Sequence, residues 1–275
     1  MRINTNIMAL NAQNKLTVNQ SGVEKSIQKL SSGLRINGAA DDAAGLAISE
    51  KMRAQIRGLN QAESNAQDGI SLIQTAEGAL QQTTDILQRM RELVVKAENE
   101  GVLSDEDKTA IDVELKALTT EIDRIADSTT FNGKKLLEGS RATAELSFKI
   151  GGNIDDCDTL TVTIGNMKTD VLLADGISIG TAEKANDALE DIDEAIKTVS
   201  TQRAKLGAVQ NRMEFAIENL STTGENLTAA ESRIRDVDMA DEMVNYTKNN
   251  ILQQSAMSML AQANQQPQQI LSLLA

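Results

Sequence analysis

Residues 59–97, LNQAESNAQDGISLIQTAEGALQQTTDILQRMRELVVKA, form the stretch that decides the fold of this chain. Small and apolar residues recur along it in steps that alternate between three and four, the spacing of helices that supercoil around one another. The seam positions are Leu59, Ala62, Ala66, Gly69, Ile73, Ala76, Leu80, Thr83, Leu87, Met90, Val94 and Ala97. No proline interrupts the stretch. The pattern therefore predicts a long helix that needs partner helices, rather than a helix that encloses a pocket.

The same spacing continues through most of the chain. A helix is predicted over about residues 43–99, which would be about 85 Å long at 1.5 Å per residue. Either Asp41 or Asp42 is a suitable cap for its start. Ser104 with Asp107 indicates the start of a second helix, and a third begins at about Thr181. The seam of the second and third helices consists of Ile111, Leu115, Leu118, Ile122, Ile125, Ala185, Leu189, Ile192, Ile196, Val199, Leu206, Met213, Ile217, Leu220, Leu227 and Ile234.

Four positions on the third seam are not apolar, namely Arg203, Gln210, Gly224 and Glu231. Polar seam positions can fix the register of paired helices at some expense of stability. Alternatively, the helix changes its packing partner at these positions. The sequence favours neither interpretation over the other.

Residues 144–179 have a different pattern, in which apolar and polar residues alternate. The alternating apolar positions are Leu146, Phe148, Ile150, Leu160, Val162 and Ile164, and glycines punctuate them. This pattern predicts a small set of short strands, and Phe131-Asn132-Gly133 predicts a turn. The fold class that we expect is mainly α, with long antiparallel helices in a coiled-coil or bundle rod and a small β-hairpin element.

The two ends of the chain are rich in Asn and Gln and carry opposite charges. Residues 1–35 hold five basic residues and one acidic residue, a net charge of +4, whereas residues 236–275 hold one basic and four acidic residues, a net charge of −3. The amino-terminal helix has little apolar area to hold it alone, so we expect it to be disordered until it packs. The carboxyl arm ends in the apolar residues Ile270, Leu271, Leu273 and Leu274, which an isolated soluble monomer would leave exposed, so neither end is well satisfied alone. Their opposite charges favour approach to each other or to neighbouring copies.

We therefore expect the terminal helices to pair as a coiled coil and to associate with other copies. The residues predicted to form this terminal core are Ile3, Ile7, Leu10, Ile27, Leu30, Leu34, Ile251, Leu260, Ile270, Leu271 and Leu274. The expected division of the chain is a terminal core of residues 1–40 and 236–275 and a rod of residues 41–235, with the β element near 144–180.

Composition argues against several classes of function. The net charge is −13 and no dense cluster of Lys and Arg is present, which disfavours binding to nucleic acid or to an anionic membrane surface. The chain has no His and only Cys157, so it lacks a His-based catalytic triad, an intramolecular disulfide and a Cys or His metal cluster. We expect no enzyme, no cofactor and no metal. No apolar run approaches about 18 residues and the start lacks the pattern of a cleavable signal, so we expect neither a membrane span nor signal-dependent secretion.

Two long motifs stand near the opposite ends of the chain. The first is Leu30-Ser31-Ser32-Gly33-Leu34-Arg35-Ile36-Asn37 followed by Ala40-Asp41-Asp42-Ala43-Ala44-Gly45-Leu46-Ala47-Ile48. The second, near the other end, is Ala230-Glu231-Ser232-Arg233-Ile234-Arg235-Asp236-Val237-Asp238-Met239-Ala240. These two motifs and the opening Met1-Arg2-Ile3-Asn4-Thr5-Asn6 resemble those of the bacterial flagellin family. The resemblance covers essentially the whole chain and leaves no room for the outer domains of larger flagellins.

The resemblance implies a structural subunit that polymerises into the flagellar filament for motility. It implies that the terminal helices form the inner tube, that the chain is secreted through the flagellar type III apparatus, and that the protein is extracellular. The implied partners are other copies of the chain, an export chaperone that binds the carboxyl arm, the filament cap and the hook-junction proteins. A weaker alternative is the related hook–filament junction protein.

The resemblance also implies recognition by the host Toll-like receptor that senses flagellin. Arg89, Leu93 and Glu114 fall on positions that match the family's receptor contacts. The competing interpretation is that Arg89 and Glu114 are ordinary solvated charges of two helices. A secreted receptor ligand or adhesin that forms no filaments is therefore a second class of function.

Overall fold

The computed structural model describes residues 6–99, 104–139, 146–152, 158–173 and 182–274. Side chains at 105, 182–184 and 267–274 lie outside this description, although their backbone is helical. The chain forms two compact units, one made of residues 1–54 and 225–275 and the other of residues 55–224. The three-part division expected from the sequence stays a prediction.

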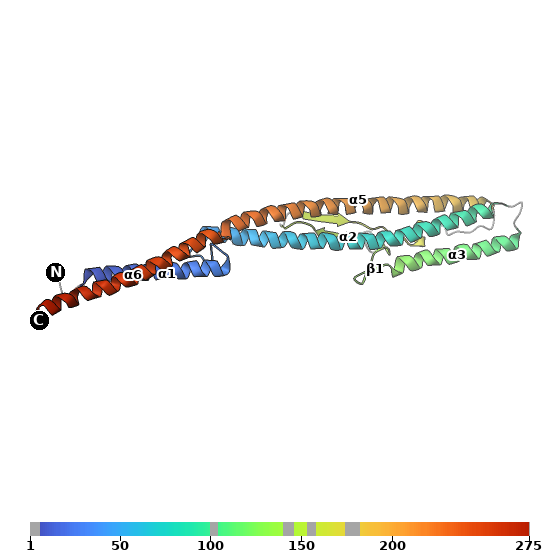
Figure 1. Cartoon of the computed structure of the whole chain (residues 1–275). Coiled ribbons are helices and arrows are strands. Elements are labelled where there is room, and N and C mark those ends of the chain that lie inside the picture. The colour runs from blue at the N-terminus through green and yellow to red at the C-terminus, as the bar shows by residue number, and fades with distance from the viewer. Residues whose placement is uncertain (1–5, 100–103, 140–145, 153–157, 174–181, 275) are drawn as a thin grey trace. The chain divides into compact units, whose positions relative to one another are not determined.

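The described chain is mainly helical, which confirms the predicted fold class (Figure 1). The helices are α1 (Ile7–Ser32), α2 (Ala43–Ala97), α3 (Asp105–Ser128), α4 (Thr169–Leu172), α5 (Ala182–Arg235) and α6 (Met239–Leu274). The strands form two antiparallel pairs, β1 (Thr130–Phe131) with β2 (Lys134–Lys135) and β3 (Leu146–Lys149) with β4 (Thr159–Val162).

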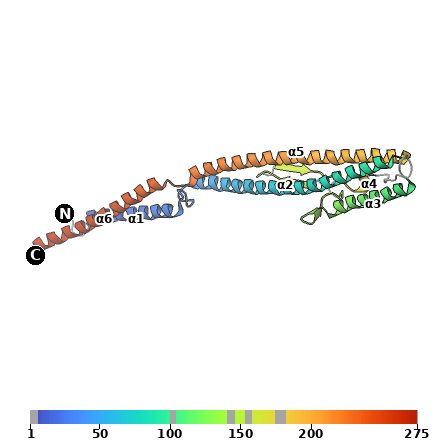
Figure 2. The same cartoon turned by 45° about the vertical axis from the view of Figure 1, so that its right-hand side comes forward.

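The core of the 55–224 unit is the seam between α2 and α5. Eleven of the twelve predicted seam positions of α2 are buried, and Leu59 is half-buried. Figures 1 and 2 show α2 and α5 side by side in this unit and antiparallel, and Ile192, Val199 and Leu206 of α5 belong to the same buried cluster as the α2 seam. Leu115 and Ile122 bring α3 into this cluster. The alternating spacing of three and four thus buries one continuous stripe, as the sequence predicts.

Polar positions on the α5 seam behave in two ways. Arg203 lies across from Glu77 of α2, with 3.8 Å between Nη2 and Oε1, which agrees with the interpretation that it fixes the register of the pair. Gln210 instead donates to Glu214 of its own helix at 2.9 Å. The polar positions therefore do not share one role.

The β3–β4 hairpin is attached to both long helices by amide side chains. Phe148 pairs with Leu160 in the antiparallel register, and Leu160 and Val162 are buried. Asn65 of α2 donates to the carbonyl oxygen of Lys149 at 3.1 Å, and the buried Gln202 of α5 donates to that of Thr163 at 2.9 Å. These two bonds give backbone carbonyl groups near the strand ends partners on α2 and α5.

The predicted turn at residues 131–133 joins β1 to β2. Asn132 and Gly133 have φ values of 48° and 72°, the left-handed conformation that a tight two-residue hairpin of right-handed twist requires. Gly adopts this conformation without strain, and Asn tolerates it better than most residues.

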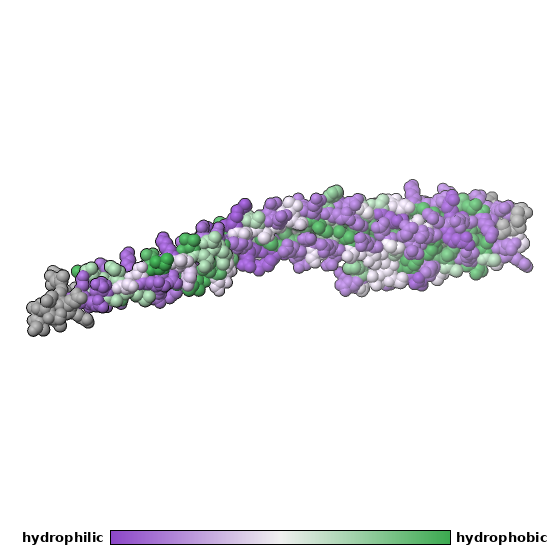
Figure 3. Space-filling model, in the orientation of Figure 1, coloured by the Kyte–Doolittle hydropathy of each residue, from purple (hydrophilic) through white to green (hydrophobic). Residues whose placement is uncertain are grey.

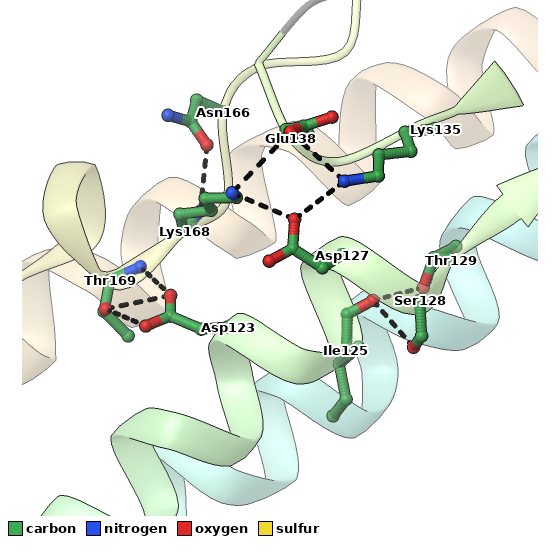
Figure 4. A network of polar contacts seen from close by, with 10 residues as sticks. All are labelled: Asp123, Ile125, Asp127, Ser128, Thr129, Lys135, Glu138, Asn166, Lys168 and Thr169. Atoms are coloured by element: carbon green, nitrogen blue, oxygen red, sulfur yellow. Dashed lines mark hydrogen bonds and ion pairs between the residues drawn. The ribbon is translucent and has the colours of Figure 1, made fainter.

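The region 144–179, predicted to form a small set of short strands, also contains α4, a single helical turn that the sequence analysis did not predict. A four-residue helix has little intrinsic stability, so its sequence shows no helical period. Tertiary contacts hold it, because Asp123 of α3 accepts hydrogen bonds from the backbone N–H and the hydroxyl of Thr169, each at 2.9 Å (Figure 4).

A second carboxylate of α3 reinforces this attachment. Asp127 pairs with Lys168 at 2.9 Å and with Lys135 of β2 at 3.2 Å, and Glu138 also pairs with Lys135 at 3.2 Å (Figure 4). The hydrogen bond from Lys168 and then that from Lys135 hold the pKa of Asp127 below its ordinary value. The network joins three segments that are distant in sequence.

In the other unit, α1 and α6 lie side by side and antiparallel (Figures 1 and 2). Asn6 caps α1 by accepting from Ala9 N–H at 3.1 Å, and its amide donates to the carbonyl oxygen of Ala263 in α6 at 2.8 Å. At the opposite end of the pair, Leu34 and Asp236 form an antiparallel bridge. Gly33 terminates α1 with φ at 71°.

The structure resolves the cap of α2 in favour of Asp42. Its Oδ1 accepts from Gly45 N–H at 2.9 Å, whereas Asp41 accepts from the N–H groups of Asn37 and Gly38 in the preceding loop. The buried Ile36 packs closely against Gly45. A Cβ added to Gly45 would lie only 2.7 Å from Cδ1 of Ile36. Residues 33–45 of the first flagellin-like motif therefore form one packed connection.

We expect Leu80→Ala to lower the free energy of unfolding by about 2–5 kcal/mol, because Leu80 is fully buried in the seam and the change leaves a cavity. Val95→Ala, at an exposed position of the same helix, is the matched control and should change it by less than about 0.5 kcal/mol. Urea unfolding followed by circular dichroism measures both. Equal effects of the two changes would contradict the assignment of the seam.

We expect Asp127→Asn to destabilise the protein at neutral pH and to lose this effect in acid. The folded pKa of Asp127 is lowered, so its contribution is fully present above the ordinary aspartate value of about 3.9 and disappears as the pH falls through the folded pKa. Urea unfolding of both proteins between pH 7 and pH 2 measures the difference. Lys168→Met should reduce this pH dependence, since Lys168 is the main cause of the shift, and a difference constant with pH would refute the explanation.

Candidate self-association surface

Exposed large apolar side chains concentrate on the two terminal helices. Among the described residues, twelve of the seventeen such side chains belong to α1 or α6. We call these twelve the terminal surface: Ile7, Met8, Leu10, Val18, Ile27, Met239, Met243, Val244, Ile251, Leu252, Met257 and Met259. Figure 3 shows apolar side chains interspersed with polar ones over α1 and α6 on the face in view. Because twelve such side chains gather on one pair of helices, this pair is the candidate interaction site of the chain.

Pairing of α1 with α6 buries little. Ser26 is the only described residue of α1 that is buried, and only Glu242 and Ala263 are buried among the described side chains of α6. The 55–224 unit, in contrast, has a continuous core of aliphatic side chains. Since most helical stability in proteins comes from packing an apolar face, α1 and α6 have less of this stabilisation, among their described side chains, than the helices of the 55–224 unit have.

One part of the terminal surface is a shallow apolar groove on α6. Met243, Val244, Thr247, Lys248 and Ile251 line it. Three of the five lining side chains are apolar, so the groove could accept an apolar side chain of another helix. Lys248 is the only charged residue among the five.

The structure places the residues predicted for the terminal core in three groups. Ile7, Leu10, Ile27 and Ile251 are exposed, and they belong to the terminal surface. Leu30, Leu34 and Leu260 are half-buried. Ile3 and the side chains of Ile270, Leu271 and Leu274 lie outside the described residues.

The predicted terminal core omits eight of the twelve residues of the terminal surface, among them Met8 and Val18 of α1. The amino-terminal arm is rich in Asn and Gln, and its apolar residues are scattered among them. Val18 follows Ile7 by eleven residues, which is about three helical turns, so both lie on one face of α1. That spacing could have identified Val18.

The residues matching the receptor contacts of the family lie in the 55–224 unit. Arg89 of α2 pairs with Glu114 of α3, with 2.9 Å between Nη2 and Oε1, and with Glu92 at 3.3 Å. The hydrogen bond that Arg89 donates to Glu114, followed by the one that it donates to Glu92, raises the pKa of Arg89. Leu93 is 4% exposed and belongs to the core. The structure thus brings Arg89 and Glu114 together at the surface and places Leu93 behind them.

Neither a membrane span nor a metal centre is found in the part of the chain that the structure describes. None of its helices combines the length and apolar character needed to cross a bilayer. It also contains no group of three or more metal-ligating side chains.

Comparison with known proteins identifies the family. Residues 3–142 match the bacterial flagellin N-terminal helical region, and residues 189–274 match the bacterial flagellin C-terminal helical region. The chain is 56% identical to the flagellin of Bacillus subtilis (strain 168) and 53% identical to the flagellar filament 33 kDa core protein of Treponema phagedenis, with all of both chains covered in each case.

A solved structure shows the same fold. The putative flagellar hook-associated protein from Vibrio parahaemolyticus has a TM-score of 0.60 at 16% identity, covering 71% of this chain and all of that one. At 16% identity this likeness concerns the fold alone. The two matched family regions include both terminal motifs, and the two flagellar relatives are similar over the whole chain. The chain therefore belongs to the bacterial flagellin family.

Proposed function

We propose that this flagellin polymerises through its terminal surface, which contacts the terminal helices of neighbouring copies. Flagellins are structural subunits of the flagellar filament and not enzymes, and they form homopolymers. The observation that carries the proposal is the set of twelve exposed apolar side chains on α1 and α6. At about 25 cal/mol per Å² of apolar area buried, their coverage by neighbours would strongly favour association.

Growth of the polymer is head-to-tail. A filament needs heterologous contacts, in which one face of a subunit meets a different face of the next and the series does not close. The chain offers two different faces, because residues 1–35 are net positive and residues 236–275 are net negative. Opposite charges on α1 and α6 favour contacts between unlike helices and disfavour contacts between like ones.

Other proteins would bind the same two helices, either before the subunit assembles or at the two ends of the finished filament. An export chaperone would cover the groove on α6 and prevent premature association of the secreted subunit. The filament cap and the hook-junction proteins would contact the terminal surface at the two ends of an extracellular filament. The support for this part is that α6 exposes seven large apolar side chains among its described residues.

A second function, recognition by the host Toll-like receptor that senses flagellin, rests on the Arg89–Glu114 pair. The pair presents a guanidinium and a carboxylate on adjacent helices, and both side chains are about half exposed. Leu93 is buried in the core, so it would act through packing rather than by touching the receptor. An exposed ion pair adds little to stability, so these two charges are available for a partner.

We expect Val244→Glu to raise the critical concentration for polymerisation at least about tenfold, because a carboxylate would be buried without a partner. Val244 is 67% exposed, so the subunit itself should fold normally. The matched control is Val113→Glu on α3, where the side chain is 63% exposed but lies outside the terminal surface. Sedimentation and electron microscopy after seeding measure polymer, and equal loss of polymerisation in both variants would refute the assignment to α6.

We expect Arg89→Ala to weaken receptor activation by the monomer at least about tenfold, since hydrogen bonds to charged groups are the strong ones at an interface. Arg91→Ala is the control, because Arg91 is also a half-exposed arginine of α2 but pairs with Asp193 of α5. A reporter assay in receptor-expressing cells measures activation. If the two variants activate equally, the interpretation of Arg89 and Glu114 as ordinary solvated charges holds.

A further inference from the structure

Methionines divide between the two units of the chain according to their exposure. The methionines of α1 and α6, which are Met8, Met239, Met243, Met257 and Met259, are between 48% and 60% exposed. In the 55–224 unit Met90, Met167 and Met213 are 3% exposed or less. Met52 is half-buried, and Met1 lies outside the described residues. Every described methionine with a largely exposed side chain therefore belongs to the terminal surface.

This distribution matters because the thioether sulfur is open to oxidation. A peroxide transfers one oxygen atom to the sulfur, so that a sulfur–oxygen bond forms while the oxygen–oxygen bond of hydrogen peroxide breaks and water leaves. The sulfur loses two electrons and the peroxide gains them. The product, methionine sulfoxide, is polar where the thioether was apolar.

We propose that the exposed methionines of α1 and α6 form an oxidation-sensitive site through which peroxides control self-association of the subunit. The inference rests on the proposed role of the terminal surface. Oxidation acts on the unassembled subunit, whose sulfur atoms are accessible, and it blocks polymerisation. Assembly in turn covers the same sulfur atoms and protects them.

The groove on α6 shows why a sulfoxide there would oppose association. Met243 lies in it beside Val244 and Ile251, so a neighbouring helix would cover the new oxygen with apolar groups. The hydroxyl of Thr247 already donates to the backbone carbonyl of Met243 at 2.8 Å. Of the five lining residues, only Lys248 carries another side-chain donor. A buried sulfoxide without a hydrogen bond is unfavourable, so oxidised subunits should associate weakly.

The site would be reversible. Methionine sulfoxide is reduced back to methionine by two classes of sulfoxide reductase, one for each epimer at sulfur. The buried methionines of the 55–224 unit would keep the core intact meanwhile, so an oxidised subunit stays folded and can recover its activity.

Accessibility is tested on the full-length chain carrying Cys157→Ser, which removes the only thiol. The monomer and the preassembled polymer are treated with graded hydrogen peroxide, quenched with free methionine and mapped by mass spectrometry. In the monomer, the five methionines of α1 and α6 should be oxidised at least about tenfold faster than Met90, Met167 and Met213, and assembly should remove most of this difference. Equal rates at the two groups in the monomer would overturn the proposal.

Assembly of the same samples tests the consequence. Oxidised monomer should show a critical concentration at least about tenfold higher than untreated monomer, and treatment with both classes of reductase should restore it. A variant with leucine at all five exposed positions conserves volume and should polymerise equally well before and after peroxide. The control variant M90L/M213L should remain sensitive to peroxide.

Two further outcomes separate this inference from the proposed function. If untreated chain forms no polymer under seeding, the proposed function fails and the inference fails with it. If untreated and fully oxidised chains polymerise alike, or if the five-leucine variant loses polymerisation on oxidation as the parent does, only the present inference is overturned.

Discussion

Burial along the seam between α2 and α5 is the interaction on which the rest of the 55–224 unit depends. Aromatic residues make up only 1% of the chain, so the buried area must come from aliphatic side chains and alanines. Such side chains fill a thin interface between helices better than a thick globular core. The seam is therefore long, and the third helix and the β3–β4 hairpin are stable only because they add to it through Leu115, Ile122, Leu160 and Val162.

The terminal helices α1 and α6 form by the same local preferences as α2 and α5, but their apolar side chains remain largely exposed. α1 and α6 are as helical as α2 and α5, and their caps and the bridge between Leu34 and Asp236 join them at both ends. Their apolar side chains nevertheless stay outside, because two helices can cover only one stripe of each other. In the function proposed above, this shortfall within a single chain is what would favour a polymer, and the same exposed side chains would be the ones that partners and oxidants reach.

Polar side chains position the smaller elements on this helical frame. Asn65 and Gln202 hold the β3–β4 hairpin on α2 and α5, and Asp123 holds α4 on α3. In the terminal unit, Arg235 is buried and its Nη1 lies 2.7 Å from Oε1 of Glu50, which ties the end of α5 to the first turns of α2. Each of these contacts joins residues that are far apart in sequence, so each adds specificity that the helical pattern lacks.

The amino-acid sequence by itself determined the long helices, the seam of α2, the hairpin strands and the family, because periodicity, turn residues and terminal motifs are local properties of the chain. It also marked the two ends as incomplete and pointed to Ile7, Leu10, Ile27 and Ile251. Only the tertiary structure decided that α4 is helical, that Asp42 rather than Asp41 caps α2, that Leu93 is buried behind Arg89 and Glu114, and which methionines are exposed. These features depend on contacts between segments that are distant in sequence. The spacing of three and four residues identifies the apolar face of a helix, but it does not identify which other segment packs against that face.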